Sequence, residues 1–65
     1  MHLYNEIVEY DLKAVKIYSK TKDTKFLNIN QQLRTWISSL QRECPPTESL
    51  NMIKEIIDNY EHPSN

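Results

Sequence analysis

A chain of 65 residues forms one domain at most, and a domain this small buries only about 60% of the surface that its unfolded chain exposes. With one cysteine and no glycine, the sequence excludes an internal disulfide, a Cys-x-x-Cys metal or redox site, and the glycine-rich loops that hold phosphates or dinucleotides. A hydrophobic share of 38% and a net charge of −1 favour a folded domain over a disordered chain.

Residues 2–18 carry apolar side chains at helical spacing. The two neighbouring stripes are Leu3, Ile7, Tyr10, Ala14 and Ile17, and Tyr4, Val8, Val15 and Tyr18. We therefore expect an amphipathic helix whose apolar face is wider than one short partner helix can cover. Asp11 interrupts this face. Because an unpaired buried carboxylate is costly, we expect Asp11 either at a water-accessible rim or paired with a cation of another helix, a tyrosine hydroxyl or a partner protein. Arg34 and Arg42 are the candidate cations.

Residues 19–25 include no apolar side chain and are expected to connect the first helix to the second. We expect the second helix over residues 24–42, with Asp23 or Thr24 as its N-cap. A later start, with Asn28 as the N-cap and Gln31 completing a capping box, is the alternative. The apolar stripe of this helix is the narrowest of the three, which predicts that it is the most peripheral helix. That stripe is Phe26, Ile29, Leu33, Trp36, Ile37 and Leu40.

Pro45 and Pro46 end the second helix, because proline cannot donate to a helical ladder and disfavours a helical conformation in the residue before it. The third helix is expected over residues 48–61, capped by Thr47, with Glu48 near its positive end and Pro63 closing it. Its apolar stripe is Leu50, Ile53, Ile56, Ile57 and Tyr60, with Met52 at the edge.

Three amphipathic helices with short connections predict an all-α fold, in which residues 1–65 form a single domain built as a small antiparallel three-helix bundle. The alternative is a hairpin of the first two helices that dimerises into a larger helical bundle. No apolar run reaches the length of a membrane span, and the first residues lack the features of a secretory signal. We therefore expect a soluble, cytoplasmic protein that does not contact a membrane.

Residues that could carry chemistry are few. His2 and His62 lie at opposite ends of the sequence without the spacing of a metal-binding motif, and Cys44 has no histidine near it in sequence. We expect no catalytic residue, no metal and no cofactor, and a protein that works by binding rather than as an enzyme.

The lysines are concentrated in one part of the chain. This basic stretch consists of Lys13, Lys16, Lys20, Lys22 and Lys25. Residues 13–25, which contain these five lysines and Asp23, have a charge of +4, whereas residues 43–61 have a charge of −4. The stretch could contact phosphates, but it includes no arginine, and a Pro-Pro break does not suit a helix-turn-helix. A small dimeric nucleic-acid-binding protein is therefore the alternative function.

The leading interpretation is a protein partner, because the apolar face of the first helix exceeds what its neighbours need and includes residue types that anchor interfaces. The candidate contact residues are Tyr4, Val8, Asp11, Leu12, Val15 and Tyr18. We hypothesise a small regulatory module that docks a helical surface on a larger protein and modulates or inhibits it. That surface is centred on the first helix or on the groove between the first and third helices, and homo-oligomerisation is a further use of it.

Overall fold

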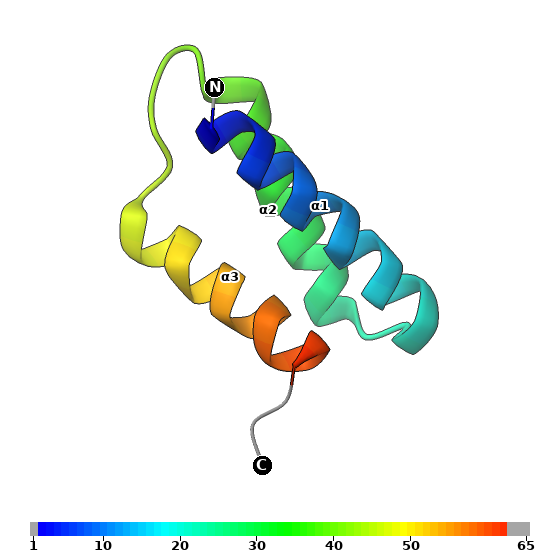
Figure 1. The fold of residues 1–65 in the computed structure, drawn as a ribbon. Coiled ribbons are helices and arrows are strands. Elements are labelled where there is room, and N and C mark those ends of the chain that lie inside the picture. Colours follow the sequence, from blue (N-terminus) through cyan, green and yellow to red (C-terminus); the bar gives the residue numbers. More distant parts are fainter. Residues whose placement is uncertain (1, 63–65) are drawn as a thin grey trace.

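Three helices make up the computed structural model, which describes residues 2–62 apart from the side chain of His2 (Figure 1). They are α1 (His2–Thr21), α2 (Thr24–Ser39) and α3 (Thr47–Glu61). The expected all-α, three-helix fold is confirmed, and no strand occurs within the described residues. None of these helices combines the length and apolar character needed to cross a bilayer.

The end of α1 lies three residues beyond the expected end, because the polar residues after Tyr18 continue the helix. The Thr21 hydroxyl donates to the carbonyl of Ile17 at 2.9 Å, and the Lys22 amide donates to the carbonyl of Tyr18 at 2.7 Å. Lys22 then ends the helix in the left-handed conformation, at φ 58°. This position usually belongs to glycine, and a residue with a Cβ adopts it at a cost of roughly 1–2 kcal/mol.

The start of α2 is set by Asp23, whose carboxylate accepts a hydrogen bond from the Lys25 amide at 2.9 Å. The expected start near Thr24 is therefore confirmed, and the alternative start at Asn28 is wrong. The helix ends at Ser39, three residues earlier than expected. The amides of Arg42 and Glu43 both donate to the Ser39 carbonyl at 2.9 Å, so a turn replaces the last helical residues.

The start of α3 lies one residue before the expected start. Pro46 holds the cap position without a side-chain hydrogen bond, so the expectation that Thr47 caps the helix is wrong. The proline ring already fixes φ at −59°, a value that suits helix entry, and the Pro46 carbonyl accepts the first helical bond from Leu50 at 3.0 Å. Glu48 lies in the first turn as expected, and Pro63 lies outside the described residues.

Two of the helices form a close pair, and the third packs on this pair more loosely. α1 and α2 lie side by side and run in opposite directions, whereas α3 approaches them less closely (Figure 1). Side-chain contacts between α1 and α3 join residues 48 positions apart, as in Tyr10 with Asp58 and Glu6 with Lys54. A constant separation means that α3 runs in the same direction as α1.

The narrow apolar stripe of α2 predicted that α2 is the peripheral helix, and the buried core shows that this prediction is wrong. Among the described residues, nine hydrophobic side chains are buried, and α2 supplies four of them. The nine are Ile7, Ala14, Ile17, Phe26, Ile29, Leu33, Trp36, Leu50 and Ile57. Phe26 and Trp36 bury a large area each, which compensates for the narrow stripe. The peripheral helix is α3, which supplies two of the nine.

We expect Leu33→Ala to lower the free energy of unfolding by about 2–5 kcal/mol, because Leu33 is fully buried at the centre of the core. Leu12→Ala should change it by less than about 0.5 kcal/mol, because Leu12 is 58% exposed. Urea denaturation followed by circular dichroism measures both values. Equal losses for the two variants would contradict this placement of the core.

Candidate interaction surface

Two flanks of α1 lie on either side of its buried face. One flank faces α3 through a polar seam, which we define as Glu6, Tyr10 and Lys13 of α1 with Lys54, Asp58 and Glu61 of α3. The other flank carries the outer strip, which we define as Tyr4, Val8, Leu12 and Val15. At 100° per residue, Val8 and Val15 lie on the opposite side of the helix from Glu6 and Lys13.

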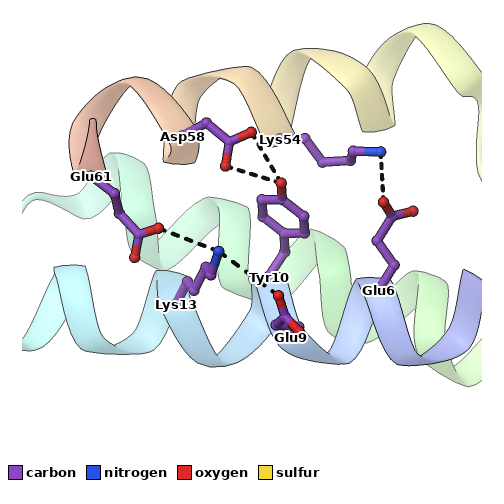
Figure 2. A network of polar contacts seen from close by, with 7 residues as sticks. All are labelled: Glu6, Glu9, Tyr10, Lys13, Lys54, Asp58 and Glu61. Carbon is purple, nitrogen blue, oxygen red and sulfur yellow. Dashed lines mark hydrogen bonds and ion pairs between the residues drawn. The ribbon is translucent and has the colours of Figure 1, made fainter. Parts of the chain in front are cut away.

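The polar seam joins the two helices at three levels (Figure 2). The Tyr10 hydroxyl lies 3.0 Å from both carboxylate oxygens of Asp58 and donates to them. Lys54 donates to Glu6 at 3.0 Å on one side of this contact. On the other side, Lys13 lies 3.3 Å from Glu61 and 3.9 Å from Glu9.

The seam arises from matched spacing, because positions 6, 10 and 13 of α1 repeat as positions 54, 58 and 61 of α3. Steps of four and three residues keep each set on one helix face. Exposed ion pairs of this kind are each worth at most about 1 kcal/mol, so the seam mainly determines the register of α3. A shift of α3 by one turn would place Asp58 opposite Glu6, two like charges. This correspondence was not predicted from the sequence.

The position of Tyr10 in the seam raises the pKa of its hydroxyl. Its pKa rises from 10.0 to about 12, chiefly because burial disfavours the charged phenolate. The hydrogen bond to Asp58 and the negative charges of Asp58, Glu6 and Glu9 raise it further. The phenol therefore keeps its proton, and its hydrogen bond, well into the alkaline range.

The outer strip stays open to solvent. Tyr4 is 45%, Leu12 58% and Val15 45% exposed, while Val8 is half-buried. These four residues follow one another at steps of four, four and three, which places them along one flank of α1. Large apolar side chains gathered on one flank differ from the scattered apolar residues of an ordinary surface.

Asp11 and Tyr18, the two other candidate contact residues, interact with this chain itself. Asp11 is half-buried and accepts a hydrogen bond from the side-chain amide of Asn30 on α2. The expectation that Arg34 or Arg42 pairs with it is wrong, because Asn30 is the α2 residue that faces Asp11. Tyr18 is half-buried, and the Lys22 ammonium lies 5.7 Å from the centre of its ring.

The structure separates the lysines of the basic stretch. Lys13 belongs to the seam, and Lys25 lies 5.4 Å from the centre of the Phe26 ring. Lys16 and Lys20 line a depression together with Glu61 at the end of α3. Glu61 of α3 therefore lies beside Lys13, Lys16 and Lys20, so no observation favours a continuous phosphate-binding surface.

A second surface, which was not predicted from the sequence, lies between α2 and α3. A groove there is lined by the apolar residues Ile29, Ile53 and Ile56. On α3, Met52 is 64% and Tyr60 44% exposed. The only signal in the sequence was the position of Met52 at the edge of its stripe. Between the first and third helices, the seam bridges α1 from Glu6 to Lys13, and the depression lined by Lys16, Lys20 and Glu61 lies beyond it.

Potential metal ligands do not gather in the described part of the chain, where no three histidine, cysteine, aspartate or glutamate side chains form a cluster. His62 is exposed at the end of α3, and Cys44 is exposed in the segment before that helix. The side chain of His2 lies outside the described residues. The absence of catalysis, metal and cofactor stays a prediction.

Alkaline titration should show the raised pKa of Tyr10 directly. The difference in absorbance near 295 nm between the wild type and Tyr10→Phe is expected to rise with a midpoint of about pH 12. Asp58→Asn should move that midpoint towards 10.0 without reaching it, because burial persists. Since the folded pKa exceeds the unfolded pKa, the contribution of Tyr10 to stability is complete below about pH 10 and is lost as the pH rises through about 12. A midpoint at 10 in the folded chain would contradict the seam.

The sequence matches no protein-family model and no curated protein, and the structure matches no solved structure. The surfaces of this chain are therefore the basis for proposing its function.

Proposed function

We propose that this protein is a small regulatory module that docks the outer strip of α1 on a larger protein and thereby modulates or inhibits that protein. The observation that carries the proposal is the exposure of Tyr4, Leu12 and Val15 along one flank of a helix. Full burial of a leucine or valine side chain is worth about 1.5–3 kcal/mol, so covering the strip would release a useful part of that free energy.

The spacing of the strip supports recognition by a groove. An amphipathic helix that lies in an apolar groove of its partner presents anchors on one face, at steps of three and four residues. Tyr4, Val8, Leu12 and Val15 have these steps and extend over about three turns of α1. A tyrosine at one end adds an aromatic anchor with a polar tip, a residue type enriched in binding hot spots.

The rest of the fold supports the proposal by holding α1 rigid. The buried face of α1 packs on α2 through Ile7, Ala14 and Ile17. The polar seam holds α3 against the flank of α1 that lies opposite the outer strip. A helix that is already ordered loses little conformational entropy when it binds, which improves affinity. A free peptide with the same strip would have to fold first.

Leu12→Lys should weaken capture of the partner at least about tenfold, which corresponds to about 1.4 kcal/mol, because it places a charge at the centre of the strip. The measurement is affinity capture from a lysate of the source cells, followed by titration of the captured protein. Met52→Lys is the matched control, since Met52 is at least as exposed as Leu12 but lies on α3.

The proposal requires one protein that the wild type and Met52→Lys retain and that Leu12→Lys loses. Equal retention by both variants would place the interface elsewhere, and a chain that captures no protein would remove the proposed function. Because both positions are exposed in the single chain, both variants should unfold at the urea concentration of the wild type in protein dilute enough to keep the chain monomeric, which circular dichroism checks.

A further inference from the structure

The outer strip also has the pattern of a surface that pairs with its own copy. We propose that two copies of this chain associate through their outer strips, with the two α1 helices antiparallel, and that this dimer covers the docking surface until a larger partner displaces one copy. This inference rests on the proposed function only because both use the outer strip. The occupant of the strip is here a second copy of this chain.

The apolar residues of the strip are spaced almost symmetrically about Leu12. An antiparallel pair related by a two-fold axis at Leu12 brings Leu12 against Leu12 of the second copy. Val8 lies four residues before this axis and Val15 three residues after it, so Val8 of each copy faces Val15 of the other. Val8, Leu12 and Val15 of the two copies thus meet one another, as an isologous interface requires, whereas Tyr4, eight residues before the axis, lies outside this apolar contact.

Charges beside the strip are complementary between two antiparallel copies. Glu9 and Lys16 are both exposed and lie seven residues apart, which is close to two helical turns, so they occupy the same flank of the strip. In the antiparallel pair, Glu9 of each copy faces Lys16 of the other, which gives two opposite-charge contacts. Within one chain, Glu9 has only a 3.9 Å contact with Lys13, with 70% of its side chain exposed.

The charge order along α1 selects the antiparallel arrangement over the parallel one. Beside the strip, the acidic residue Glu9 precedes the basic residue Lys16. A parallel pair would place Glu9 beside Glu9 and Lys16 beside Lys16. Antiparallel pairing places Glu9 of each copy beside Lys16 of the other, an arrangement that favours association and fixes orientation.

Asp11 is next to Leu12 in sequence, so the two-fold axis would bring the Asp11 carboxylates of the two copies, which are like charges, near each other. It lies on the flank of the strip that faces α2, where the Asn30 amide donates to its carboxylate. This hydrogen bond directs the charge towards α2 of its own chain rather than towards the second copy. The dimer therefore does not require a change at Asp11.

The dimer would also increase the stability of so small a domain. A chain of 65 residues has a limited core, and association with another chain is one of the usual supplements. Since self-pairing and partner docking use the same side chains, the affinity for the partner should fall as the concentration of the free chain rises. The strip is then regulated by mass action.

Sedimentation equilibrium over a range of concentrations tests the dimer and its charges. Glu9→Lys converts two opposite-charge contacts into two like-charge contacts, and Lys16→Glu does the same, so each should weaken the dimer about tenfold. The double variant Glu9→Lys with Lys16→Glu exchanges the charges and should restore the affinity. Glu55→Lys, an exposed change on α3, is the control and should have no effect.

Cysteine cross-linking tests the register, in a Cys44→Ser background that removes the natural exposed thiol. Leu12→Cys should oxidise to a covalent dimer, because residue 12 faces itself across the axis. Val15→Cys alone should remain monomeric on oxidising gels, whereas an equal mixture of Val8→Cys and Val15→Cys chains should form a mixed dimer.

A chain that sediments as a monomer at millimolar concentration overturns the dimer, as does a dimer that Glu9→Lys leaves unchanged or in which Val15→Cys cross-links as well as Leu12→Cys. If the chain is monomeric but Leu12→Lys still loses its captured partner, the dimer fails and the proposed function stands. If the dimer behaves as expected but capture does not depend on Leu12, the proposed function fails and the dimer stands.

Discussion

The contact between the Tyr10 hydroxyl and the Asp58 carboxylate lies at the middle of the seam that joins α3 to the paired helices α1 and α2. Since α3 contributes only Leu50 and Ile57 to the buried core, apolar packing alone defines its position loosely. The flanking contacts of Glu6 with Lys54 and Lys13 with Glu61 repeat the same separation, which fixes which flank of α1 is covered. The opposite flank, with the outer strip, stays exposed.

The helices themselves could be predicted because apolar periodicity acts within one segment. Helix ends depend on contacts that periodicity does not report, which is why Lys22 in a left-handed conformation and Pro46 at a cap position were not expected. Stripe width was also a poor guide to burial, because Phe26 and Trp36 fill the core from a narrow face. The pairing of Asp11 with Asn30 follows from how α1 and α2 face each other, which no single segment encodes.

The candidate contact residues divide into two groups once the fold is known. Asp11 and Tyr18 interact with α2 or with Lys22 and belong to the internal architecture, whereas Tyr4, Leu12 and Val15 remain exposed. An excess of apolar residues on α1 could be read from the sequence, but the flank on which it stays exposed depends on where α3 docks. Function, as we propose it, is thus a consequence of the seam.

A double-mutant cycle on Tyr10→Phe and Asp58→Asn tests most directly whether the seam positions α3. The free energies of unfolding of the wild type, the two single variants and the double variant are measured in urea at neutral pH. Residues in direct contact should give a coupling energy of about 1 kcal/mol. Effects of the two substitutions that add without coupling would show that α3 is held by other contacts, and the explanation of the exposed strip would lose its basis.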